Sequence, residues 1–158
     1  MAKGASARDA QLILQLYDLR REAEMRKARN WWMTEFWPNN ADDFLKVAYA
    51  TGTQENNWLR QVGGYWGIAT SFVLEGALSE ELFLKPAFSG EMFVMFAKVY
   101  PFLGELREKL GEPEALEDIE KVIMRTKWGR ERLKFMLKRL EMWRERMKQK
   151  NAEAANAG

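Results

Sequence analysis

Apolar side chains recur three and four residues apart along most of the chain, the spacing of one face of an α-helix. In the N-terminal part this stripe is formed by Leu12, Leu16, Leu19, Ala23 and Ala28. Ser6 and Asp9 resemble a capping box with Asp in place of the usual Glu, and Pro38 disfavours helix at the residue before it. The pattern therefore predicts one long helix from near Ser6 to about Phe36.

Polar caps and helix breakers divide the remaining chain into shorter segments of the same period. N-terminal caps are expected at Asn39 or Asn40, Thr53, Ser79 and Ser89. Stops are expected at Gly52, Gly76 and Gly111. Pro101 falls within an apolar pattern that it should kink or split, whereas Pro113 suits the first turn of a further helix. The last helix is expected over about residues 129–150.

No segment shows the alternating pattern of a β-strand, and the connections between the predicted helices are short. The chain has 158 residues, which suits one domain with a proper core. We therefore predict an all-α bundle of about six or seven helices with no sheet. Residues 1–150 should form a single helical domain, and the small polar residues 151–158 should fray.

Composition removes most catalytic and cofactor chemistry. The sequence contains no cysteine and no histidine, which excludes disulfides, thiolate metal sites and histidine-based acid–base catalysis. We accordingly expect no enzyme activity, no catalytic or metal-binding residue and no cofactor. The N-terminus lacks an apolar run, and no stretch is long and apolar enough to cross a bilayer, so a cytoplasmic protein without a transmembrane segment is expected.

Charge is unevenly distributed although the net charge is only +2. Residues 30–124 carry 15 acidic and 7 basic side chains, whereas residues 125–150 carry 11 basic and 3 acidic ones. An acidic body followed by a strongly basic helix is more informative than the near-neutral total.

The basic helix also carries an apolar stripe. The alternatives are that its own domain or a symmetry mate covers this stripe, that the helix lies on a membrane surface, or that the basic residues contact nucleic acid. We favour self-association as a homodimer, with candidate interface residues Trp31, Trp32, Leu133, Met136, Leu137, Leu140, Trp143 and Met147. The alternative, nucleic-acid binding, would use the phosphate-contacting candidates Arg130, Arg132, Lys134, Lys138, Arg139, Arg144 and Arg146.

Three local patterns add expectations. Gly63 and Gly67 share a face of a predicted helix and should allow close helix packing, so Gly67→Leu should overpack it. A ligand on the glycine face is the alternative. Trp31 and Trp32 are adjacent, so at least one should lie at the surface, at a subunit contact or under a following segment. The mixed charges of residues 20–29 are typical of a solvated helix face.

The region from about residue 54 to residue 124 resembles an uncharacterised bacterial helical family, one of the domains of unknown function. The resemblance rests on residues 72–82, Phe-Val-Leu-Glu-Gly-Ala-Leu-Ser-Glu-Glu-Leu, and on residues 100–103, Tyr-Pro-Phe-Leu, followed by Glu105, Arg107 and Glu108. It implies an all-α fold and brings no catalytic residue. Members of such families often have membrane helices ahead of this domain.

Overall fold

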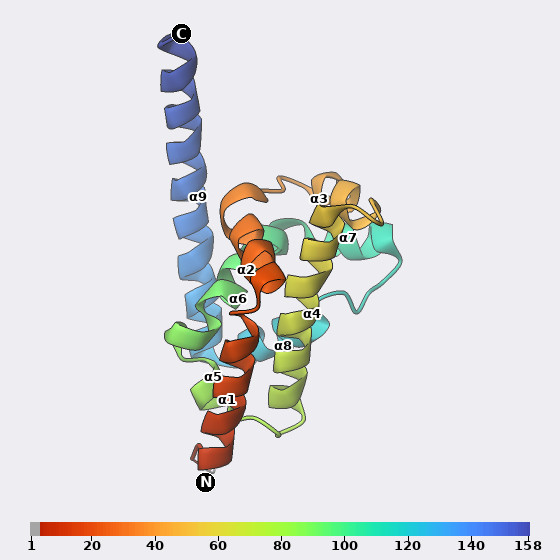
Figure 1. The fold of residues 1–158 in the computed structure, drawn as a ribbon, viewed down its shortest axis with the longest axis vertical. Helices are drawn as coiled ribbons and strands as arrows, with labels where there is room; N and C mark the ends of the chain where they lie inside the picture. The colour runs from red at the N-terminus through yellow and green to blue at the C-terminus, as the bar shows by residue number, and fades with distance from the viewer. Residues whose placement is uncertain (1–3) are drawn as a thin grey trace.

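The computed structural model describes residues 4–158, which fold into helices and contain no strand (Figure 1). The predicted all-α class is therefore confirmed. The helices α1 to α8 form a body, and the long helix α9 runs along one side of it and extends beyond it (Figure 1).

The N-terminal region is divided where the sequence predicted one continuous helix. Helix α1 spans Ala7–Leu19 and α2 spans Ala23–Asn30, followed by a π-helical turn over Trp31–Glu35. The capping box of Ser6 and Asp9 is present. The single-helix prediction is wrong because Glu22 accepts a hydrogen bond from the Met25 backbone N–H and so starts a new helix. The break also lets Arg20 turn inward, where it is buried.

The next three helices begin at the predicted caps. Helix α3 spans Ala41–Ala48 after Asn40, α4 spans Gln54–Leu74 after Thr53, and α5 spans Glu80–Phe83 after Ser79. Each cap accepts a hydrogen bond from a backbone N–H three residues later. These helix starts follow from local side-chain chemistry alone.

Two boundaries in the following region differ from the predictions. Helix α6 spans Pro86–Val99, so it begins at Pro86 rather than at Ser89. Pro101 lies in a short 3₁₀ turn that separates α6 from α7, Leu103–Leu110, as the predicted split requires. Helix α8 covers Glu117–Met124 and does not begin at Pro113, because residues 113–116 form turns that end at Leu116 with a φ of 59°.

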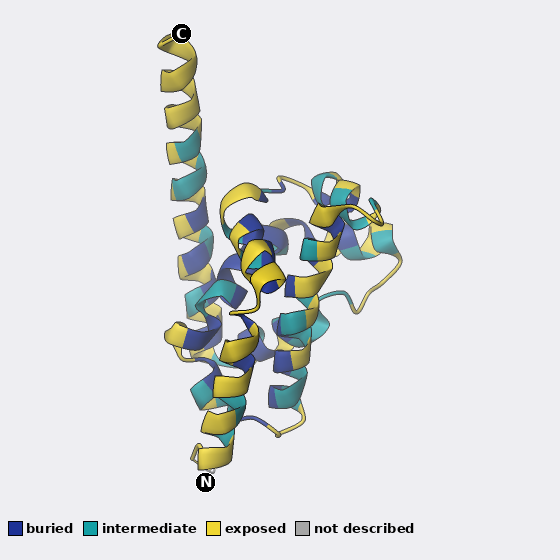
Figure 2. Cartoon of the chain, in the orientation of Figure 1, coloured by how far each residue is buried: buried dark blue, intermediate teal, exposed yellow. Residues whose placement is uncertain are grey.

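Helix α9 is the longest element and spans Lys127–Asn156. It includes residues 151–156, which the sequence analysis expected to fray; Ala152, Ala154 and Ala155 are strong helix formers and favour its continuation. The residues from 149 onward are exposed (Figure 2). The helix therefore leaves the body before it ends.

Helix α6 forms the centre of the core. Every residue from Met92 to Val99 is buried, because α6 packs against α9 on one side and also contacts α8 and the π-helical turn. Helix α4 packs against α2, α3 and α8. The fold thus surrounds one apolar helix with amphipathic ones.

Candidate functional site

The predicted interface stripe on α9 lies mainly inside the domain. Leu133, Met136 and Leu140 are 3–4% exposed and belong to the core, because their face of α9 packs against the body. These three residues are therefore unavailable as an intermolecular seam in this structure. Leu137, Trp143 and Met147 are partly exposed.

Trp31 and Trp32 are both core residues, which corrects their assignment to an interface. Trp31 stacks on Phe36 and lies near Trp58 of α4, whereas Trp32 lies near Phe44 of α3. A π-helical turn holds more residues per turn than an α-helix, so it shifts the facing of successive side chains. The following helices α3 and α4 then cover the two rings. Burial under a following segment was one of the three placements expected from the sequence.

The basic side chains of α9 are not neutralised by the acidic body. Among the described residues, no salt bridge joins α9 to another helix. Of the phosphate-contacting candidates, Arg130, Lys134, Lys138, Arg139 and Arg146 are exposed and Arg132 is partly buried. Arg144 is held at the body, since it donates hydrogen bonds to the Pro38 carbonyl and to Asn39 Oδ1.

The glycine face of α4 is open, which contradicts the predicted close helix packing. A Cβ atom placed on Gly63 or Gly67 would meet no atom within 4 Å. Both glycines line a cleft of about 350 Å³ whose opposite wall is Leu116 and the start of α8. The packing prediction is wrong because the turn before α8 stands away from this face of α4.

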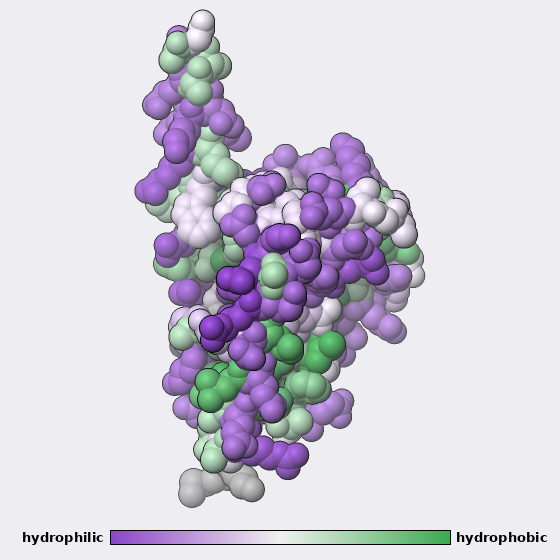
Figure 3. All heavy atoms as spheres, viewed as in Figure 1, coloured by the Kyte–Doolittle hydropathy of each residue, from purple (hydrophilic) through white to green (hydrophobic). Residues whose placement is uncertain are grey.

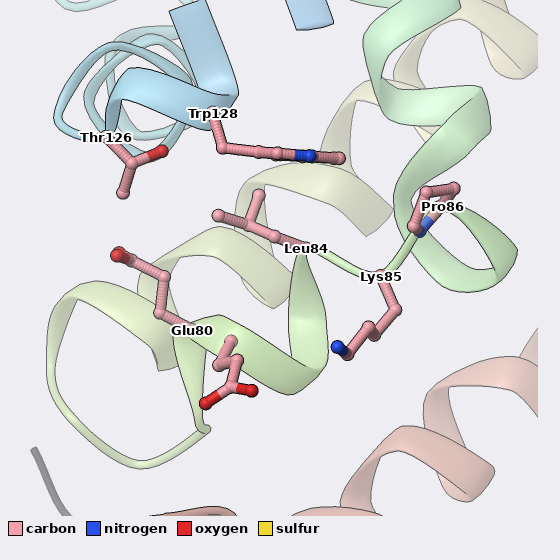
Figure 4. Close-up of a pocket in the computed structure, with 7 residues that line it drawn as sticks. Glu80, Leu84, Lys85, Pro86, Thr126 and Trp128 are labelled. Carbon is pink, nitrogen blue, oxygen red and sulfur yellow. The ribbon is translucent and has the colours of Figure 1, made fainter.

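A second cleft, of about 420 Å³, lies between α5 and the start of α9. Trp128 extends over Leu84 toward Pro86, and Glu80, Glu81 and Lys85 are the charged residues of its lining (Figure 4). Glu80 forms a salt bridge with Arg125 just before α9. Because of this salt bridge, Glu80 is not free to form a catalytic carboxylate pair with Glu81. No cluster of metal-binding side chains occurs among residues 4–158.

A third cleft, a groove of about 440 Å³ between the α1–α2 junction, α6 and α9, is lined by several charged side chains. Its lining includes four arginines, Arg20, Arg29, Arg132 and Arg139, and a single carboxylate, that of Glu91. We call these residues the arginine groove. Arg29 and Glu91 form a two-pronged ion pair with N–O distances of 2.5 and 2.8 Å, and this pairing raises the pKa of Arg29.

The other arginines differ in how their donors are used. Arg20 donates to the Phe88 carbonyl and to the Tyr65 hydroxyl, and its guanidinium lies 4.4 Å from the centre of the Phe88 ring. Arg132 and Arg139 form no salt bridge or side-chain hydrogen bond with any described residue, and the Nε of Arg132 is buried without a partner. The charge pattern of residues 20–29 predicted a solvated face. Arg20 and Arg29 were therefore missed, because only the fold reveals which side chains turn inward.

A buried lysine on α6 was also missed. Lys98 is 1% exposed, and its ammonium donates to the carbonyls of Trp32, Met33 and Phe36. It also lies 3.8 Å from the centre of the Trp37 ring. Burial, with a smaller effect from Arg144, lowers the pKa of Lys98 to about 7. The sequence carried a signal, since Lys98 is the single charge within the apolar run from Met92 to Val99.

A comparison with protein-family models matches residues 5–128 to a domain of unknown function, DUF4760. The chain belongs to the DUF4760 family. A search of curated proteins and of solved structures finds no match. The predicted resemblance to a domain-of-unknown-function family is confirmed, and it extends over more of the chain than residues 54–124.

The DUF4760 match covers the body and ends at the start of α9. In the arginine groove, Arg20, Arg29 and Glu91 belong to the matched region, whereas Arg132 and Arg139 follow it. No helix in the described part of this DUF4760 chain is long and apolar enough to cross a membrane. The groove therefore joins the family domain to the helix that follows it.

Proposed function

We propose that this chain is a non-catalytic helical assembly module that pairs with a second copy of itself through distal α9, residues 141–156. The observation that supports this proposal is the extension of α9 beyond the body after its contacts at Trp143 and Arg144, as a helix whose residues from 148 onward are exposed (Figure 1). Most helices in proteins are stabilised mainly by the packing of one face rather than by helix propensity. A partner helix would supply the missing packing.

Distal α9 offers apolar side chains for such a contact. Met142 is 57% exposed, and Met147, five residues further along the helix, is partly exposed. Thioether side chains adapt to the shape of a partner surface. Trp143 and Arg144 instead contact Trp37, Pro38 and Asn39 of the body, and so fix the direction in which the helix leaves it.

The charge pattern decides which part of α9 can pair with itself. Residues 127–140 carry six basic side chains and one acidic one, whereas residues 141–156 carry four basic and three acidic ones. Two proximal halves would repel each other, but two distal halves crossing antiparallel bring charges of both signs together. A two-fold dimer centred on distal α9 satisfies both conditions.

Light scattering at increasing protein concentration tests the proposal. The unmodified chain is expected to approach twice the mass of 18.5 kDa, and Met142→Glu with Met147→Glu is expected to remain at the monomer mass. Ile68→Glu is the matched control, because Ile68 is also 57% exposed but lies on α4. A monomer at all concentrations, or a dimer that survives the double substitution, contradicts the proposal.

The second candidate function is nucleic-acid binding by proximal α9. It is favoured by the exposed basic side chains Arg130, Lys134 and Lys138, which form no salt bridge with another helix within residues 4–158. Phosphate binding by such a surface should weaken steeply as salt concentration rises. Charge removal at Lys134 and Lys138 should then weaken oligonucleotide binding and leave the mass in solution unchanged.

A further inference from the structure

The arginine groove has a large excess of positive charge for its size. Arg20 from the α1–α2 junction, Arg29 from α2, and Arg132 and Arg139 from α9 line one groove, and Glu91 forms a salt bridge with only one of them. Arginine remains protonated under all ordinary conditions, so the excess cannot be relieved by losing protons. Gathering like charges in this way costs free energy that an anion would offset.

The unused hydrogen-bond donors point to the same conclusion. The Nε–H of Arg132 is shielded from solvent and has no acceptor among the described residues. Buried donors in folded proteins nearly always have a partner, and an unpaired one calls for an explanation. The terminal nitrogens of Arg132 likewise have no acceptor among the described residues, and because Arg132 lines the groove, an anion bound there is the simplest acceptor for them.

Arg139 adds a second unused guanidinium on the same wall. It lies seven residues, about two helical turns, after Arg132, on a similar face of α9. Its guanidinium is 5.1 Å from the centre of the Trp143 ring. The stacking orients Arg139 while leaving its donors without an acceptor among the described residues.

We propose that the arginine groove binds a small molecule bearing a phosphate group. Guanidinium forks match the oxygens of phosphate, and several arginines around one space suit a doubly charged tetrahedral group better than a single carboxylate. The groove volume of about 440 Å³ lies within the range of small-molecule sites. Tyr17 and Trp143 also line it and provide aromatic surfaces for the remainder of the ligand.

Isothermal titration with phenyl phosphate and with inorganic pyrophosphate tests this assignment. Arg132→Gln and Arg139→Gln are each expected to weaken binding at least tenfold. Arg146→Gln is the matched control: it removes the same charge from an exposed position of α9 outside the groove, and should change affinity less than twofold. Arg132→Lys should restore only part of the loss, because lysine keeps the charge but not the fork.

The variants also distinguish a small ligand from a nucleic-acid backbone. Binding of neither probe by the unmodified chain overturns the proposal, as does an equal loss in Arg146→Gln. A single-stranded oligonucleotide that displaces the probes also tests the proposal. If Lys134→Gln weakens binding of that oligonucleotide as much as Arg132→Gln does, the phosphate belongs to a nucleic-acid surface and the proposal is likewise overturned. Thermal melts of each variant establish that it is folded, and Arg139→Gln alters an exposed side chain, so the fold should survive it.

Discussion

Lys98 places a titratable group in the centre of the core. Its pKa of about 7 lies below the ordinary value of 10.5, so between these two pH values the unfolded chain binds more protons than the folded chain. Stability should therefore rise with pH across this window, and the penalty is complete below pH 7. The Lys98 side chain also donates hydrogen bonds to three backbone carbonyls, and these bonds tie the π-helical turn to α6.

Lys98→Met isolates this contribution. We expect the free energy of unfolding of the unmodified chain to increase relative to that of the variant as pH rises from 7 to 9.5. Urea unfolding at several pH values measures the difference in the free energy of unfolding between the two chains. The protonation of all other groups contributes equally to both chains and cancels in this difference. Parallel curves for the two chains would show that Lys98 does not change its protonation in this range.

The glycines on α4 give a second prediction at the residue scale. Because the face is open, Gly63→Ala and Gly67→Ala should each stabilise the chain, by about 0.8–1 kcal/mol from helix propensity. Gly129→Ala is the contrasting variant, since its Cβ would lie 2.0 Å from the Ile123 carbonyl oxygen and should destabilise the chain. Urea unfolding measures all three, and a loss of stability at Gly63 or Gly67 would restore the packing hypothesis.

At the scale of elements, a long-range contact ties the junction between α1 and α2 to the rest of the fold. Arg20 reaches from the end of α1 to the Phe88 carbonyl of α6 and the Tyr65 hydroxyl of α4. Arg20→Met should cost about 1–3 kcal/mol, because it leaves buried polar groups unpaired. Arg21→Met, at an exposed neighbouring position, should change stability by less than about 0.5 kcal/mol. Equal effects of the two in chemical unfolding would contradict this role.

The same contrast explains which elements the sequence could predict. The caps at Ser6, Asn40, Thr53 and Ser79 depend on side chains within three residues of the helix start, so local pattern was sufficient. The inward turn of Arg20 depends on a carbonyl 68 residues away, which no local pattern records. The arginine groove was missed for this reason, since its arginines belong to α2, α9 and the α1–α2 junction, which only the fold brings together.

At the scale of the whole molecule, α9 belongs to the core although the family match ends at its start. Leu133, Met136 and Leu140 follow residue 128 and are almost completely buried, and Trp128 at the boundary packs edge-on against Phe93 of α6. The body of the family domain is therefore not closed without the proximal half of this helix. The distal half, by contrast, contributes little to the core beyond the contact of Trp143 with Trp37.

Two truncations test this division of α9. A chain that ends at residue 128 loses three buried side chains worth about 1.5–3 kcal/mol each, a sum comparable with the whole stability of an ordinary domain. It also exposes the face of α6 that α9 covers. We expect this chain to be unfolded or aggregated, with little cooperative melting by circular dichroism. A chain that ends at residue 144 keeps Leu133, Met136, Leu140 and the hydrogen bonds of Arg144, and should melt within a few degrees of the full-length monomer. A folded, cooperative chain of residues 1–128 would show instead that the family domain closes its own core and that α9 only rests upon it.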